Sequence, residues 1–343
     1  MNGKKTLSTL IVLFMILGAT LSFAKDTESK WGTIKGKIYM GLKFEDVGAA
    51  VNTQDMFVLE RAYFTYKKKI GAGFSMRITT DIIGNETNGT ADDTPFTPYI
   101  KYGYLQWKMD VNLFKIETQL GMVGTPILGL TDKLGGMRWV TKNYFDNSSK
   151  IAQKMDNSAD LGWNLSLNIL KIVTFTGAIT AGEGYKDIAA GETDGSKALY
   201  GLITVNPIEE LSVIAFVRTN GHNGLNENDL YCGAGIAWKS KLIKVGANYA
   251  YVTTDNDTNK DHVIDVWANF NFKSLIDMPI LLMGRFALGM NTVADSTKTN
   301  ILGGIGYKFN SNVQAMILYK VEDTFSDASS AVHNLYLKVE AKF

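Results

Sequence analysis

Cysteine, histidine and proline are scarce in this 343-residue chain, and its charges almost cancel. The single cysteine, Cys232, excludes an intrachain disulfide framework and a cysteine-rich zinc site. The three histidines, His222, His262 and His333, lie far apart in the sequence, so we expect no metal site and no cofactor. A formal charge of +1 argues against a nucleic-acid-binding surface. The mean hydropathy of −0.03 does not separate a soluble protein from a membrane protein.

The first 24 residues have the pattern of a secretory signal peptide. Lys4 and Lys5 precede an apolar run, and the segment ends in Ser22-Phe23-Ala24, with small residues at both positions that signal peptidase reads. We therefore expect a cleaved signal peptide at 1–24 and a mature domain over 25–343. A retained N-terminal anchor is the alternative, but the uncharged stretch barely reaches spanning length. No later stretch resembles a transmembrane helix, so any membrane span must consist of strands.

The mature chain alternates apolar and polar residues with a period of two, which is the pattern of a β-strand with one apolar side. From Ile34 to Phe44 every second residue is apolar or glycine, whereas Lys35 and Lys37 lie on the other face. The alternation is weakest at 56–67, where Glu60 falls on the apolar face, and at 98–108, which is aromatic on both faces. The recurring pattern predicts sixteen strands, at 32–44, 56–67, 72–83, 98–108, 112–123, 159–169, 172–182, 198–205, 211–219, 229–239, 242–253, 262–273, 280–290, 299–309, 313–321 and 333–343.

The connections between these strands alternate between short and long. This is the layout of an all-β, transmembrane antiparallel β-barrel of the outer membrane, with short periplasmic turns and long extracellular loops. An even strand number places both termini in the periplasm. Aromatic residues at outward positions near the short turns predict a belt at the inner membrane interface, formed by Tyr66, Trp107, Trp238, Phe272, Phe309 and Phe343. A secreted, strand-rich soluble protein of the lectin or repeat type is the alternative.

The third long loop, at 124–158, exceeds all the others in length. Sixteen strands enclose an aqueous channel rather than a packed core, and a long loop in a compact fold is usually functional or disordered. Because this loop contains several aromatic residues, we expect it to fold into the lumen and narrow the channel. An extracellular flap without influence on selectivity is the alternative.

Charged residues in this loop and on the inner wall are the candidate filter. The loop charges predicted to form the constriction are Asp132, Lys133, Arg138 and Lys142. The pore wall is predicted to include Arg61, Arg77, Lys115, Arg218, Lys244, Arg285 and Lys320. Rings of lysine and arginine favour anions, so a weak anion preference is expected, with unselective hydration of a wide pore as the alternative. The long loops gather acidic residues, which either are simply solvated or bind divalent cations shared with lipopolysaccharide phosphates.

Several stretches resemble a known family. The sixteen-strand layout, the C-terminal segment 335–343 ending in phenylalanine, the segment 57–64 and the segment 121–126 followed by 136–139 are similar to the Gram-negative porins, especially the phosphate-selective porins O and P. The resemblance implies a homotrimer in the outer membrane, contacts with lipid and lipopolysaccharide, and a third loop that forms the constriction. The terminal Phe343 resembles the signal that the barrel-assembly machinery reads.

The chain departs from the phosphate-selective pattern in its arginine content. It has only five arginines among 35 basic residues, and lysine lacks the forked guanidinium that recognises phosphate oxygens. We therefore expect a channel for small hydrophilic solutes and for anions in general, without enzymatic activity. The alternatives are a lipase-like or protease-like outer-membrane enzyme that uses a histidine at the rim, and an adhesin or structural barrel with a closed lumen.

Overall fold

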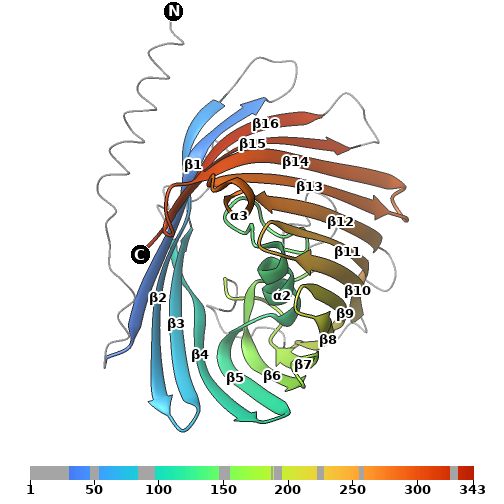
Figure 1. The fold of residues 1–343 in the computed structure, drawn as a ribbon. Helices are drawn as coiled ribbons and strands as arrows, with labels where there is room; N and C mark the ends of the chain where they lie inside the picture. Colours follow the sequence, from blue (N-terminus) through green and yellow to red (C-terminus); the bar gives the residue numbers. More distant parts are fainter. Residues whose placement is uncertain are drawn as a thin grey trace, which may run out of the picture.

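The computed structural model describes residues 31–46, 54–83, 97–146, 155–186, 188, 195–221, 228–254, 259–324 and 331–343. Within these ranges the chain forms one closed antiparallel barrel, in which each strand pairs with its neighbours in the sequence and β1 pairs with β16 (Figure 1). The strands are β1 (Thr33–Asp46), β2 (Gln54–Gly71), β3 (Phe74–Ile83), β4 (Thr97–Val111), β5 (Phe114–Gly124), β6 (Ala159–Ile169), β7 (Val173–Thr180), β8 (Lys197–Ile208), β9 (Leu211–Gly221), β10 (Asn228–Lys239), β11 (Ile243–Thr254), β12 (Asn259–Asn271), β13 (Ile280–Asn291), β14 (Ser296–Lys308), β15 (Val313–Thr324) and β16 (Val332–Lys342).

All sixteen predicted strands are confirmed, and their ends differ from the prediction by at most four residues, at the end of β2. Two helices were not predicted: α2 (Pro126–Gly135), in the third long loop, and α3 (Lys273–Ile276), in the turn between β12 and β13. No helix in the described ranges is long and apolar enough to cross a membrane. The predicted signal peptide at 1–24, His222 and most of the acidic loop residues lie outside the described residues.

The outer surface of the barrel is apolar around its circumference, as the alternation predicts. Side chains such as Leu120, Ile301 and Ile317 are more than half exposed, although each lies in the middle of a strand. A contiguous apolar surface of this extent is unfavourable in water and favourable in a hydrocarbon environment. The predicted belt residues Trp238, Phe309 and Phe343 also lie exposed near the end of the barrel that carries the short turns.

Two single-residue bulges interrupt the alternation at its two weakest points. Between β1 and β2, Tyr39 pairs with Arg61 and Met40 pairs with Leu59, so Glu60 is left without a partner position. Between β3 and β4, the register likewise skips Lys101. An extra residue in one strand changes the parity of the side chains that follow it. Glu60 therefore forms an ion pair with Lys338 (2.5 Å) instead of occupying the apolar outer face.

The barrel closes where the C-terminal residue meets β1. The amide of Gly36 donates to the carbonyl of Phe343 (2.8 Å), and the amide of Phe343 donates to the carbonyl of Gly36 (3.1 Å). The Phe343 ring lies over Gly36, so that a Cβ atom at residue 36 would stand only 2.0 Å from the ring Cζ atom. Glycine at residue 36 is therefore required for the terminal ring to pack at the seam.

We predict that Gly36→Ala lowers barrel stability only while the ring of Phe343 is present. In refolded protein the substitution should destabilise the barrel by about 1–3 kcal/mol, the usual cost of overpacking. In a Phe343→Ala background it should have almost no effect, because nothing remains for the new methyl group to meet. The measurement is the temperature at which the folded band converts to the unfolded band in gel electrophoresis.

Gly284→Ala is the matched control, because a Cβ atom at this strand residue would meet nothing within 4 Å. Equal destabilisation by Gly36→Ala in both backgrounds would contradict the packing of Phe343 on Gly36.

Candidate pore constriction

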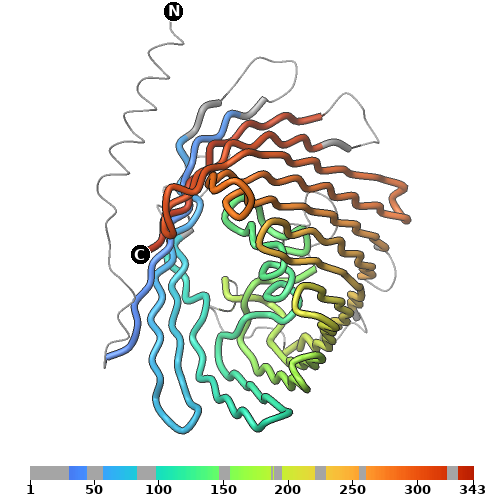
Figure 2. The backbone as a smooth tube through the Cα atoms, viewed as in Figure 1, coloured from blue at the N-terminus to red at the C-terminus, as the bar shows by residue number. Residues whose placement is uncertain are grey.

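The third long loop enters the barrel, as predicted, and begins there with α2 (Figure 1). Pro126 stands in the first turn of this helix, where its missing N–H would be unpaired in any case. The helix ends at Gly136, whose φ of 70° is left-handed, and the Gly136 amide donates to the Asp132 carbonyl (2.9 Å). Figure 2 shows the loop inside the barrel, nearer to the yellow and orange strands than to the blue ones.

Apolar packing fixes the loop on one side of the lumen. Ile127, Leu128 and Phe145 pack with inward-facing side chains of β7 to β12, and Trp139 and Val140 pack with those of β13 to β15. The inner wall under the loop therefore carries many apolar side chains, which include Leu202, Phe216, Val252, Leu281, Met283, Leu302 and Leu318. The interpretation of the inner face as polar throughout is wrong for these strands, because a loop shields them from the channel water.

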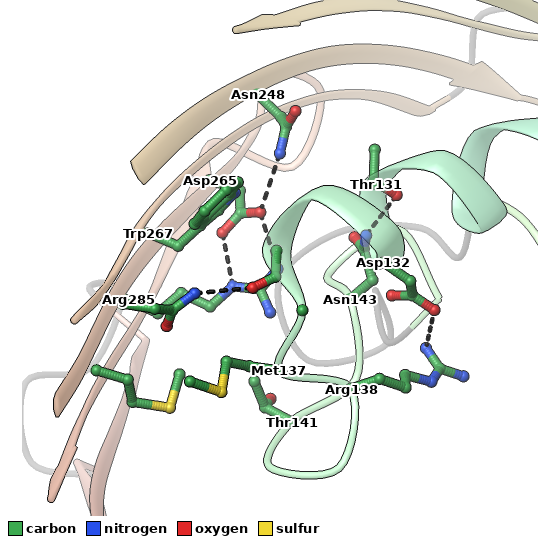
Figure 3. Close-up of a pocket in the computed structure, with 14 residues that line it drawn as sticks. Thr131, Asp132, Met137, Arg138, Thr141, Asn143, Asn248, Asp265, Trp267 and Arg285 are labelled. Atoms are coloured by element: carbon green, nitrogen blue, oxygen red, sulfur yellow. Dashed lines mark hydrogen bonds and ion pairs between the residues drawn. The ribbon is translucent and has the colours of Figure 1, made fainter. Parts of the chain in front are cut away.

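Two arginines predicted for the pore wall instead fasten this loop. Arg285 forms a double ion pair with Asp265 (Nε–Oδ1 2.7 Å, Nη2–Oδ2 2.8 Å; Figure 3). It also donates to the Lys142 carbonyl at 3.2 Å. Arg218 is 4% exposed and donates to the hydroxyl of Tyr200 (3.0 Å) and the carbonyl of Met155 (2.9 Å). Neither guanidinium faces open solvent, because both are occupied by protein acceptors.

The carboxyl of Asp156 belongs to the same anchor. Tyr200 donates to it at 2.9 Å, and Arg218 Nε lies 3.9 Å away. Burial raises the pKa of Asp156 to about 6, although Arg218 and the hydrogen bonds oppose the shift. The C-terminal end of the loop is thus held by the polar contacts of Asp156 as well as by the apolar contacts of Met155.

A second cluster of ion pairs fixes the positions of charged side chains within the third loop. Arg138 forms ion pairs with Asp132 (3.3 Å) and Asp146. Burial raises the pKa of Asp132, with Arg138 opposing the shift, whereas the attraction of Arg138 overcomes burial at Asp146 and lowers the pKa of that carboxyl. Asn143 donates to the hydroxyl of Thr131 and so ties the descending chain to α2 (Figure 3).

An open space of about 440 Å³ remains between the loop and β1 to β4. Of the four loop residues predicted for the constriction, Asp132 and Arg138 line this space, whereas Lys133 and Lys142 are exposed elsewhere and do not. Three tyrosines, Tyr39, Tyr63 and Tyr102, also face it. Six cationic side chains and one carboxylate line the space: Lys35, Lys37, Lys67, Arg77, Lys101 and Arg138 against Asp132.

The other predicted wall residues have different positions. Arg77 lines the space, with its guanidinium 4.1 Å from the centre of the Tyr102 ring. Arg61 is 8% exposed and paired with Asp81 at 2.6 Å, so it lies behind the lining. Lys115 is exposed on β5, outside the space.

The last two predicted wall lysines, Lys244 and Lys320, contact other parts of the protein. The Lys244 ammonium lies beneath the end of α2, 3.0 Å from where a Cβ atom of Gly136 would stand, and Lys320 forms an ion pair with Glu322.

Of the four lining lysines, Lys35 and Lys37 lie on the face expected to be polar, whereas Lys67 and Lys101 were absent from the prediction. Lys35, Lys37 and Lys67 lie at inward positions of their strands, so the alternation of the sequence predicts that they face the lumen. The alternation does not predict the position of Lys101, because this residue is the bulge of β4 and interrupts the regular alternation of inward and outward side chains. Its ammonium contacts Asp81 (3.4 Å) and the hydroxyl of Tyr63 (3.3 Å).

The two described histidines form pairs with tyrosines at the rim. His262 Nδ1 lies 2.8 Å from the Tyr249 hydroxyl, and His333 Nδ1 lies 2.7 Å from the Tyr319 hydroxyl. Both tyrosines are about half exposed on the outer face of the barrel.

Solved porin structures share this architecture. The chain superposes on OmpF of Salmonella typhi, solved with daunomycin, with a TM-score of 0.67, 10% identity and coverage of 93% of this chain and 100% of that one. For the anion-selective porin of Comamonas acidovorans the values are 0.65, 11%, 91% and 99%. For the trimer form of OmpT of Vibrio cholerae they are 0.59, 12%, 90% and 98%.

No protein-family profile and no curated protein matches the sequence. At these identities the structural similarity establishes the fold, a closed sixteen-stranded porin barrel.

We predict that Arg285→Met loosens the third loop and that adding Asp265→Leu restores it. Removing one partner of a buried pair leaves an unpaired charge and costs about 3–5 kcal/mol, whereas replacing both partners by apolar residues is often neutral. The measurement is the rate of tryptic cleavage after Lys133 and Lys142 in folded protein. A cleavage rate of Arg285→Met equal to that of the wild type would show that Arg285 does not hold the loop.

Proposed function

We propose that the protein is an outer-membrane porin, a water-filled channel through which small hydrophilic solutes and ions diffuse passively, with a preference for anions. The observation that carries the proposal is the space of about 440 Å³ beside the third loop, which is lined by six cations and one carboxylate. Charges that line a narrow aqueous passage attract ions of the opposite sign and exclude those of the same sign. The apolar outer surface supports insertion of the barrel in a bilayer, which also requires every strand edge to be paired.

The lining chemistry favours anions in general rather than phosphate in particular. Four of the six lining cations are lysines, which act as hydrated point charges, and Arg138 already forms ion pairs with two carboxylates. The narrower resemblance to the phosphate-selective porins O and P therefore remains a hypothesis based on the sequence motifs.

The placement of the protein follows from the same proposal. We place the barrel in the outer membrane of a Gram-negative bacterium, with both termini and the short turns in the periplasm, after removal of the signal peptide. A homotrimer in contact with lipid and lipopolysaccharide is proposed by analogy with porins, and one of the similar structures is a trimer form of OmpT. Neither nucleic acid nor enzymatic activity has a place in this function.

The experiment that tests the function is single-channel recording of the refolded mature protein in a planar bilayer. Stepwise openings and a reversal potential of the anion-selective sign in a KCl gradient are expected. A folded barrel that inserts without conducting would contradict the channel and favour the structural or enzymatic alternatives.

Reversing the charge of two lining lysines should reverse or abolish the preference. We predict that Lys37→Glu combined with Lys67→Glu lowers the anion-to-cation permeability ratio by about threefold or more, because both ammonium groups line the open space. Lys115→Glu combined with Lys241→Glu is the matched control, because it makes the same change in net charge outside that space. An equal effect of both pairs would show that overall charge, and not this lining, sets the preference.

The preference should also depend on pH through Asp132. Because burial raises the pKa of this carboxyl, Asp132 becomes neutral at a higher pH than an exposed carboxyl does. As the pH falls from 7, the space loses its one negative lining charge, and the reversal potential should move toward greater anion selectivity. Asp132→Asn should show the larger anion preference already at pH 7 and lack this part of the pH dependence. A variant that titrates like the wild type would exclude Asp132 as the group responsible.

A further inference from the structure

A second segment of the chain, Ala181–Lys186, also turns into the barrel. It follows β7 and is held by its own hydrogen bonds, in which the amides of Ala181 and Tyr185 donate to the carbonyls of Leu161 (2.9 Å) and Ala159 (3.0 Å). The carboxyl of Asp160 accepts from the amides of Gly182 (2.6 Å) and Gly184 (3.2 Å). Ala181–Lys186 is called the strap below.

The strap reaches strands that are distant from its own. The hydroxyl of Tyr185 donates to Asp81 Oδ2 on β3 at 2.9 Å and accepts from Arg61 Nη1 on β2 at 3.1 Å. The ring of Tyr185 packs edge to face on Tyr99 of β4, with ring centres 6.2 Å apart, and the Lys101 ammonium lies 5.2 Å from its centre. Tyr185 therefore links β6 and β7 to β2, β3 and β4, and of these three strands β3 and β4 contribute no residue to the apolar clusters of the third loop.

The part of the wall that the strap covers can be identified by comparing the exposure of side chains at paired positions on neighbouring strands. Lys37, Tyr63, Asp81 and Tyr99 lie side by side on β1, β2, β3 and β4. Lys37 and Tyr63 line the open space, whereas Asp81 in the same row is fully buried. Tyr185, which is itself 5% exposed, covers Asp81 together with Arg61 and Lys101, which also contact the Asp81 carboxyl. At this height the strap thus closes the lumen in front of β3 and leaves it open in front of β1 and β2.

We infer that the strap is a second constriction element, and that Tyr185 sets the size limit of the channel together with the third loop. This inference rests on the proposed function, because a size limit has meaning only for a conducting pore. The strap acts on charge as well as on size, since Tyr185 contacts Arg61, Asp81 and Lys101, which are all buried, and Lys101 also lines the open space. The two inward segments divide the lumen between them: the third loop covers β7 to β15, and the strap covers β3 and its neighbours.

Removing the side chain of Tyr185 is the direct test. We expect Tyr185→Ala to raise single-channel conductance about 1.5-fold or more and to admit larger neutral sugars in liposome swelling, because the passage in front of β3 opens. Tyr185→Phe keeps the ring and should keep the wild-type size limit. Asp160→Ala leaves Tyr185 intact but removes the acceptor of the Gly182 and Gly184 amides, so it should widen the pore as Tyr185→Ala does. Wild-type conductance and size limit in both Tyr185→Ala and Asp160→Ala would overturn the inference.

A labelling measurement separates this inference from the proposed function. In a Cys232→Ser background, Lys101→Cys places a thiol beside the Tyr185 ring, and a charged methanethiosulfonate should label it about tenfold faster after Tyr185→Ala. Equal labelling rates would overturn the strap whether or not the barrel conducts. A silent wild-type barrel with faster labelling in Tyr185→Ala would instead support the strap and contradict the open channel.

Discussion

The structure depends on one constraint, which is that every strand edge must be paired. An open sheet edge inside a bilayer would leave amide and carbonyl groups without partners, and each unpaired group costs several kcal/mol. The sixteen strands meet this requirement only because β16 returns to β1, and the exchange of hydrogen bonds between Gly36 and Phe343 lies at the end of that seam. Closure also fixes the inside and the outside of every strand, so the seam determines which side chains can meet in the lumen.

Closure with sixteen strands creates a second problem, because the lumen is too wide for wall side chains alone to fill. The chain fills it from one side. Aromatic and aliphatic residues of the third loop pack on an apolar inner wall, and the Arg285–Asp265 pair adds a directional contact at the centre of that wall. Burial of apolar surface gives the loop its position, and the paired charges give it a defined register. The strap then occupies part of the remaining side.

The sequence predicted the barrel far better than the constriction, for a physical reason. Contact with the outer apolar environment imposes a period of two on every strand, so all sixteen strands could be read from local pattern. The lumen imposes no such period, because loop and wall contacts join residues far apart in the chain. Arg218 and Arg285 were therefore assigned to the pore although they anchor the loop, and the contact between Tyr185 and Asp81 left no local signal. Lys101 was missed because a bulge changes its parity.

Arginine and lysine differ in their contacts: most arginines are paired with carboxylates, whereas lysines make up most of the cations that line the open space. This difference explains how an almost neutral chain can have a space lined mainly by cations. Arg61, Arg138, Arg218 and Arg285 each engage a carboxylate, which suits the forked geometry of the guanidinium group. These pairs withdraw Asp81, Asp156 and Asp265 from the passage, since all three carboxylates are buried. Of the lining lysines, Lys101 is buried against Asp81, whereas Lys35, Lys37 and Lys67 are exposed to the open space. There an ammonium group is strongly hydrated and attracts anions without holding them in a fixed geometry. In the proposed function, such a lining would favour both the entry and the release of anions, and release is as necessary for conduction as entry.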